Sequence, residues 1–137
     1  MSCASCSGHN LEMYKGRDKT AKFYIAGIGT LAGSSIVFTV KQDIDDTDIE
    51  FDKKNTAAGG DDSQIKIVED YIKYTEDPES PLFDQWVGVV EVYIVPADTV
   101  DLLNADYQYD LVITLSSGRE LQVIRPSRLT LLQPVTV

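Results

Sequence analysis

The sequence predicts an all-β protein, an antiparallel β-sandwich of about seven strands with a flexible N-terminal arm. Three observations lead to this fold class. Apolar and polar side chains alternate over residues 107–115, which is typical of a strand with one buried face. Short segments rich in β-branched residues are separated by turn-forming residues. No segment has the periodicity of a long amphipathic helix, and a small closed barrel is the alternative arrangement of such strands.

The N-terminal segment is predicted to be the arm. It is rich in Gly, Ser, Asn and charged residues, and Leu11, Met13 and Tyr14 are its bulky apolar side chains. So few apolar groups do not build an element with a core of its own. We therefore expect a mobile arm over residues 1–20 and a sandwich over residues 21–137.

The first half of the sandwich should contain three strands. Residues 22–28 have the composition of a strand and lead into a glycine-rich turn. Ser35–Lys41 is dominated by β-branched residues and places its apolar side chains on one face, which predicts a core strand. Residues 43–52 alternate acids with apolar side chains, which indicates a solvated loop leading into an edge strand.

The middle of the chain is less regular. Ile65 and Ile67 alternate as in a strand, whereas the apolar residues that follow them have helical spacing. We favour a strand over residues 64–74 that continues or bends near Glu69. Residues 75–81 contain two prolines and are expected to form a long surface insertion.

The last third of the chain begins with a predicted strand over residues 86–95. Pro96 ends this strand because it lacks the backbone donor that a sheet requires. Asp98 can cap a short helical turn over residues 99–103.

A predicted hairpin follows this turn. The strand over residues 107–115 turns back into residues 120–124, and residues 128–132 form the last strand. Tyr107 and Tyr109 lie on the face assigned to the core. Plain packing is the favoured interpretation of both, and a hydrogen bond from one of them at a sheet corner is the alternative.

Composition limits the classes of partner. The 137 residues are enough for one domain with its own core, and the net charge is −10. A surface of this charge repels phosphate backbones and anionic lipids, so nucleic acid and membrane are excluded as partners and a basic protein surface is favoured. The chain has neither an apolar run of about 20 residues nor the pattern of a secretory signal, so we expect a soluble protein made in the cytosol.

Three residues near the N-terminus have metal-ligand chemistry. Cys3, Cys6 and His9 are spaced as zinc ligands often are, but a structural zinc site needs four ligands. Glu12 or a neighbouring subunit would have to supply the fourth. The favoured interpretation is therefore no cofactor, with the two thiols either reduced or joined in an adventitious disulfide, and zinc is the alternative.

The sequence gives little support for catalysis. The single histidine lies in the predicted arm, and neither a nucleophile elbow nor a phosphate-binding loop is present. The acidic run over residues 43–52 departs from the EF-hand pattern, because Asp48 stands where the loop needs Gly and Lys54 where it needs Glu. We expect a protein that is not an enzyme.

Several short segments of the sequence resemble the immunoglobulin-like domains of tailed-bacteriophage virion proteins, and are similar to the N-terminal domain of phage upper-baseplate proteins. The segments are Ser35–Lys41 with the acidic loop after it, Pro96-Ala97-Asp98-Thr99, Leu102-Leu103, Tyr107-Gln108-Tyr109-Asp110-Leu111, the glycine-centred hairpin at Gly118, and Pro134-Val135-Thr136. The chain departs from the pattern in its longer insertion over residues 71–84 and in Arg125-Pro126.

The resemblance implies an immunoglobulin-like sandwich that serves as a building block of the virion, in the head, neck, tail or baseplate. Its implied partners are other virion proteins, with several copies in a symmetric assembly. For docking we single out apolar residues in the arm and in the insertion, which are Leu11, Met13, Tyr14, Leu82, Phe83 and Trp86. If buried, the last three would instead plug one end of the sandwich. A carbohydrate-binding or adhesion module is the alternative function.

Overall fold

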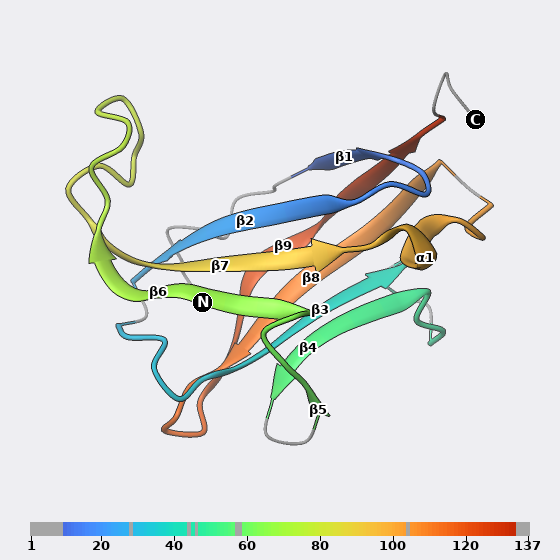
Figure 1. The fold of residues 1–137 in the computed structure, drawn as a ribbon. Coiled ribbons are helices and arrows are strands. Elements are labelled where there is room, and N and C mark those ends of the chain that lie inside the picture. Colours follow the sequence, from blue (N-terminus) through green and yellow to red (C-terminus); the bar gives the residue numbers. More distant parts are fainter. Residues whose placement is uncertain are drawn as a thin grey trace.

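The computed structural model describes residues 10–133 except 28, 44, 46, 57, 58 and 104, and gives only the backbone of residues 59, 60 and 122–126. In this part of the chain two β-sheets pack face to face, with one short helix at one end (Figure 1). The prediction of an all-β sandwich is thus confirmed, with nine described strands in place of about seven.

The larger sheet has the strand order β1-β9-β8-β3-β4-β5, and the smaller sheet has the order β2-β7-β6. All pairs are antiparallel except β1 with β9, which is parallel. The bounds of the elements are β1 Leu11–Tyr14, β2 Lys19–Ala26, β3 Ser35–Lys41, β4 Phe51–Thr56, β5 Gly59–Gly60, β6 Ile65–Lys73, β7 Trp86–Ile94, α1 Pro96–Thr99, β8 Asp106–Thr114 and β9 Glu120–Leu132.

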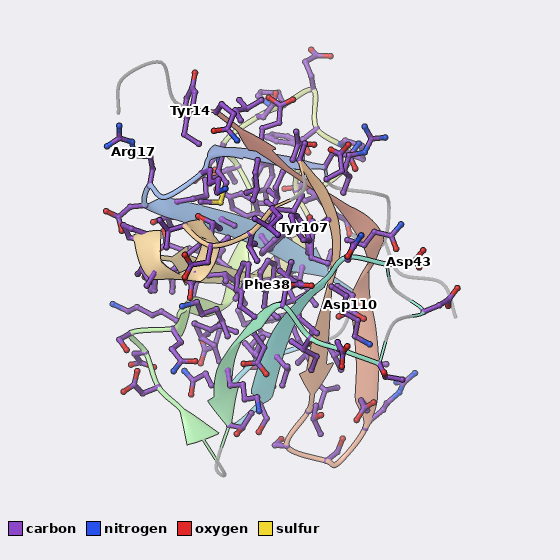
Figure 2. All side chains as sticks on the ribbon, turned by 90° about the vertical axis from the view of Figure 1, so that its right-hand side faces the viewer. Tyr14, Arg17, Phe38, Asp43, Tyr107 and Asp110 are labelled. Carbon is purple, nitrogen blue, oxygen red and sulfur yellow. The ribbon has the colours of Figure 1, made fainter. Side chains whose placement is uncertain are left out.

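The core lies between the two sheets and is built by alternation along the strands. In β3 every second residue is fully buried, as the sequence pattern predicted. Tyr109 is fully buried, with its ring 5.1 Å from that of Phe38 and 6.2 Å from that of Phe23 in the opposite sheet. Figure 2 shows Phe38 and Tyr107 inside the molecule, and Tyr14 and Arg17 at its periphery.

The Tyr109 hydroxyl is hydrogen-bonded to the side chain of Ser127, its register partner on β9. A hydrogen bond from one of the two core tyrosines was the alternative prediction. The bond is present, but its acceptor or donor is the Ser127 side chain on the neighbouring strand and not a group at a sheet corner. Burial raises the pKa of Tyr109 well above its usual value, and the bond to Ser127 opposes that effect.

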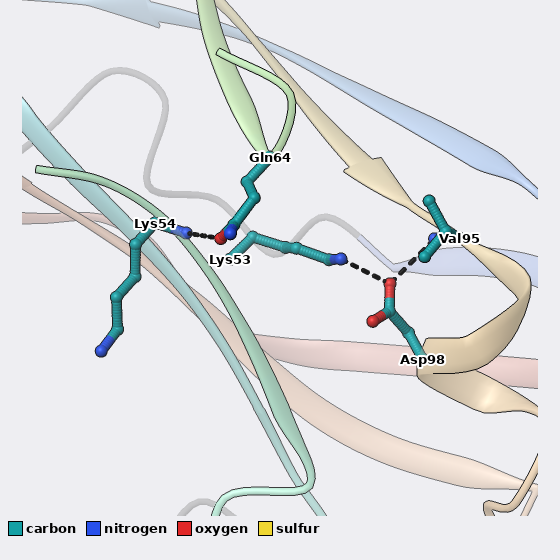
Figure 3. A network of polar contacts seen from close by, with 5 residues as sticks. All are labelled: Lys53, Lys54, Gln64, Val95 and Asp98. Atoms are coloured by element: carbon teal, nitrogen blue, oxygen red, sulfur yellow. Dashed lines mark hydrogen bonds and ion pairs between the residues drawn. The ribbon is translucent and has the colours of Figure 1, made fainter. Parts of the chain in front are cut away.

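Polar contacts join the two sheets at one edge. Lys53 on β4 forms an ion pair with Asp98 on α1, with Nζ and Oδ2 2.7 Å apart (Figure 3). The Asn55 side-chain amide donates to the backbone oxygen of Ile65 on β6 at 2.8 Å. The Asn55 bond links β4 to β6, the edge strand of the smaller sheet. The described residues of these two strands have no backbone pairing with each other, so the arrangement is an open sandwich and not a closed barrel.

The expectation of a free arm over residues 1–20 is wrong for its described second half. Leu11–Tyr14 forms strand β1, and β2 already begins at Lys19. The Met13 side chain is 5% exposed and belongs to the core, against which Leu11 also packs. The reason is tertiary, because β1 is held by parallel pairing with β9 at the other end of the sequence.

Further boundaries differ from the predictions. The edge strand expected within residues 43–52 is β4, Phe51–Thr56. The last two predicted strands form one strand, β9, which continues through Pro126. Register partners Tyr109 with Ser127 and Leu111 with Ile124 leave two residues of β9 opposite one of β8, so the proline lies in a bulge, where its missing donor is tolerated. The helix begins at Pro96, three residues earlier than expected.

The strand predicted around Glu69 is confirmed as β6. Of the two courses left open there, the strand takes the irregular one, because its pairing with β7 shifts register on both sides of Glu69. Asp98 lies inside α1, and its carboxylate accepts the Val95 backbone N–H at 2.8 Å. Among the described residues, no helix is long and apolar enough to cross a membrane.

Candidate docking surface

The smaller sheet projects beyond the sandwich at the end opposite α1 (Figure 1). Leu31, in the connection between β2 and β3, closes the core there: it is fully buried, and its N–H donates to the Asp70 oxygen of β6 at 3.0 Å. It occupies the space over Gly88, where a Cβ atom would lie 2.6 Å from the Leu31 Cγ. Beyond Gly88 the inner face of β7 is no longer covered by the larger sheet.

Trp86 lies on this uncovered face, because alternation along β7 places it on the same side as Gly88 and the buried Val90. Its indole stacks on the ring of Tyr71 from β6, with centroids 4.9 Å apart and planes 16° from parallel. Trp86 is 50% exposed and Tyr71 47%. We call this ring pair the aromatic ledge.

The ledge is fixed by backbone pairing. Lys73 on β6 is the register partner of Trp86 on β7, and its Nζ lies 2.9 Å from Oδ1 of Asp84. Beyond the strands the hairpin continues, since the Tyr74 N–H donates to the Gln85 oxygen at 2.8 Å and the Asp84 N–H donates to the Tyr74 oxygen at 2.8 Å. The rings are therefore held on a rigid support and do not sit on a free loop.

The loop over residues 74–85 is tied to the outer face of the smaller sheet. The Tyr24 hydroxyl on β2 donates to Oε2 of Glu76 at 2.6 Å. The rings of Tyr24 and Tyr74 meet edge to face with centroids 5.0 Å apart. The hydrogen bond to Glu76 and then burial raise the pKa of Tyr24. The Lys22 ammonium, 5.4 Å from the Tyr24 ring centre, has a raised pKa because of its interactions with that tyrosine.

These contacts border a shallow pocket of about 220 Å³ on the outer face. Val87 and Val89 form its apolar floor, and both are buried although they face away from the main core. Carboxylates and ammonium groups of both signs line the rim, which consists of Lys22, Glu69, Lys73 and Glu76. The pocket is smaller than sites for drug-sized ligands and suits one ring or one side chain.

The six residues singled out for docking divide between core and surface. Tyr14, Phe83 and Trp86 are exposed, whereas Leu82 is half-buried against the second apolar cluster. Leu11 and Met13 pack in the core, so their assignment to docking is not supported by their positions. The alternative prediction, that Leu82, Phe83 and Trp86 plug one end of the sandwich, is wrong. Phe83 and Trp86 are exposed, and Leu82 packs on the outer face of the smaller sheet.

The residues assigned to zinc, Cys3, Cys6 and His9, lie outside the described part of the chain. Within the described part, no three or more His, Cys, Asp or Glu side chains converge as metal ligands do. The acidic loop between β3 and β4 thus gathers no such group from its described residues.

Tyr71, Tyr24 and Tyr74 were not predicted from the sequence as site residues. Tyr71 reaches Trp86 only because β6 shifts register twice before it pairs with the start of β7. A usable signal was present, since an aromatic residue near the end of one strand and another at the start of the next are neighbours if the two strands form a hairpin.

No protein-family model matches the chain, and a search of curated proteins finds no match either. The function proposed below therefore rests on the geometry of this chain and on the resemblance of its sequence segments to phage virion domains.

Proposed function

We propose that the protein is a non-enzymatic structural component of a tailed-phage virion, which docks onto other virion proteins through the aromatic ledge. The proposal takes the class of particle from the sequence resemblance. Its docking surface rests on one observation, the half-exposed Trp86 stacked on Tyr71 at the uncovered end of the smaller sheet. Several copies in a symmetric particle are part of the proposal.

The ledge has the physical properties of an interface anchor. Tryptophan and tyrosine bury large areas on binding, and aromatic residues are enriched among the residues that dominate interface energy. Because Tyr71 and Trp86 already hold each other in place, little side-chain entropy is lost when a partner covers them. Phe83 in the adjoining loop adds exposed apolar area at the same end.

Assembly with candidate virion proteins tests the proposal. The chain is co-expressed with the structural proteins encoded next to it, and its content in the sedimenting particle fraction is measured. Trp86→Ala should lower incorporation by tenfold or more, since truncation of an interface tryptophan costs about 2 kcal/mol or more. Leu103→Ala is the matched control, because Leu103 is 92% exposed but lies just beyond α1 at the other end.

Equal incorporation of the Trp86→Ala variant and the wild type would show that the ledge is not the docking surface. If the wild-type chain sediments with none of these assemblies, the virion role itself is wrong. Both variants change exposed side chains, so unchanged thermal unfolding is the check that loss of incorporation reflects binding.

A carbohydrate-binding or adhesion module is the second candidate, and the outer-face pocket favours it. A sugar ring has an apolar face that fits the floor at Val87 and Val89, while its hydroxyls can reach the charged rim. Binding on a glycan array that is lost in Tyr74→Ala but kept in Trp86→Ala would support this function over assembly, because Tyr74 lines the pocket and Trp86 lies on the opposite face of β7. Absence of any glycan signal would remove it.

A further inference from the structure

We propose that the aromatic ledge binds the guanidinium group of an arginine in a basic segment of the partner protein. This inference rests on the docking role proposed above and adds the chemistry of the occupant. Two properties of this end of the molecule lead to it, an accessible ring face and an excess of carboxylates around it.

The ring face is open on one side only. Tyr71 covers one face of the Trp86 indole at 4.9 Å, yet half of the Trp86 surface is exposed, so the opposite face and the rim are accessible. A cation is attracted to such a face, and tryptophan attracts it most strongly among aromatic residues. Guanidinium is flat and weakly hydrated and therefore stacks on rings, whereas the ammonium of lysine is compact and strongly hydrated.

The segment that borders the ledge is acidic. Residues 74–85 contain four carboxylates and no lysine or arginine, the acids being Glu76, Asp77, Glu79 and Asp84. All four are exposed, although Glu76 accepts a hydrogen bond from Tyr24 on the outer face and Asp84 forms an ion pair with Lys73. A cation that stacks on Trp86 can therefore pair with a carboxylate of the same loop, and the partner is complementary in both charge and shape.

Lys73 is the cation already present beside the ledge. It pairs with Asp84 at 2.9 Å, and both side chains are largely solvated, at 46% and 67% exposure. Exposed ion pairs of this kind are weak, so an incoming guanidinium can share or replace Lys73 at Asp84. Removal of Lys73 should strengthen binding of a basic segment.

Other occupants fit less well. A second copy of the chain carries the same net charge of −10 and would bring more acidic surface to an acidic end. A neutral sugar could stack on the indole but would leave the carboxylates without a countercharge.

Trp86 is the only tryptophan of the chain, so its fluorescence reports directly on the proposed site. The experiment titrates the purified full-length protein with a nonapeptide of arginine and, separately, with a nonapeptide of lysine, at physiological salt. The arginine peptide should change the emission of Trp86 with saturation and bind about three- to tenfold more tightly than the lysine peptide. Equal affinities would overturn the proposal, because they indicate charge attraction without stacking.

Variants locate the site. The triple change Asp77→Asn, Glu79→Gln and Asp84→Asn should weaken binding of the arginine peptide at least fivefold. The matched control, Asp43→Asn, Asp45→Asn and Asp48→Asn, removes the same charge from the loop between β3 and β4, and should change the affinity less than twofold. An equal loss in both triple variants would overturn the proposal, since binding would then follow net charge alone.

Anisotropy of a labelled arginine peptide extends the test to variants without tryptophan fluorescence. Trp86→Ala and Tyr71→Ala should each weaken binding fivefold or more, whereas Lys73→Ala should strengthen it about twofold. Unchanged affinity in Trp86→Ala would overturn the arginine site. If the peptide binds as expected but particles incorporate Trp86→Ala normally, the virion docking role fails and the arginine site stands; if incorporation depends on Trp86 but the peptide does not bind, the reverse holds.

Discussion

The Lys53 ammonium and the Asp98 carboxylate, 2.7 Å apart, join strand β4 of the larger sheet to helix α1, which follows strand β7 of the smaller sheet (Figure 3). Their side chains are only 10% and 16% exposed. The same Oδ2 atom also accepts the Val95 N–H at 2.8 Å, at the point where β7 ends. One carboxylate oxygen therefore holds both the edge of one sheet and the end of a strand in the other.

We predict that Lys53→Met lowers the free energy of unfolding by about 1–3 kcal/mol, between the values for exposed and for fully buried pairs. Asp98→Ala should cost about 1 kcal/mol more, because the Val95 N–H also loses its acceptor. Lys54→Met is the control: its ion pair with Asp52 is 3.5 Å long and solvated, so the change should stay below about 1 kcal/mol. Urea denaturation measures all three, and equal costs for Lys53→Met and Lys54→Met would contradict the prediction.

The burial of Met13 gives a second prediction. Met13→Ala should lower the free energy of unfolding by about 2–4 kcal/mol, because the side chain lies in the core and leaves a cavity when it is truncated. Glu12→Ala, on the opposite face of the same strand, should stay within about 0.5 kcal/mol. Thermal or chemical unfolding compares the two, and a harmless Met13→Ala would mean that β1 contributes little in solution.

The close approach of Gly88 to Leu31 gives a third prediction. Gly88→Ala should destabilise the protein by about 1–3 kcal/mol, since the added methyl group overlaps the Leu31 side chain in a packed core. In a Leu31→Ala background the same methyl group has space, so the cost of Gly88→Ala should shrink or change sign. Denaturant unfolding of the four proteins of this double-mutant cycle checks the coupling. Additive costs would show that the two residues do not share the space.

The buried phenol of Tyr109 gives a prediction about alkaline pH. Its pKa is raised in the folded protein, so the unfolded chain loses this proton first, at a pH near 10. The folded state then holds more protons, and stability falls as the pH rises above about 10, by at most about 1.4 kcal/mol per pH unit. Below that pH the contribution is constant.

Tyr109→Phe lacks this titration and should decline less steeply between pH 9 and 11, although it starts lower by about 0.5–1.5 kcal/mol because the bond to Ser127 is gone. Urea denaturation at a series of pH values provides both curves. The other tyrosines with raised pKa, Tyr24 and Tyr93, are present in both proteins and cancel in the comparison. Parallel curves would rule out Tyr109 as the titrating group.

The strands in which apolar and polar residues alternate clearly were predictable from the sequence. Alternation marked Ser35–Lys41 with its exact bounds and placed β7 and β8 within a residue of their ends. The irregularity near Glu69 was one of the two possibilities that the sequence left open, because the apolar period changes there. In each case a short-range signal and the buried face agree.

The elements that depend on distant partners were not predictable. β1 has four residues, and what makes it a strand is its pairing with Leu129–Leu132 register partners on β9, more than a hundred residues away. Likewise, Pro126 was expected to separate two strands. It lies within one strand because the pairing of β9 with β8 forms a bulge there, and this pairing is not visible in the local sequence. In the candidate site, Trp86 was identified because it is a large aromatic residue next to Leu82 and Phe83. Tyr71 was not identified, since its contact with Trp86 depends on how β6 and β7 are paired.

The parallel pairing of β1 with β9 has a consequence for biosynthesis. Leu11 emerges from the ribosome early, whereas its register partner Leu129 is translated more than a hundred residues later, so the larger sheet cannot be completed before β9 has emerged. Until then the hydrogen-bonding edge of β8 that pairs with β9 is open to other nascent chains. We therefore expect folding to finish only after β9 has been synthesised, on the millisecond-to-second scale of proteins dominated by long-range strand pairing.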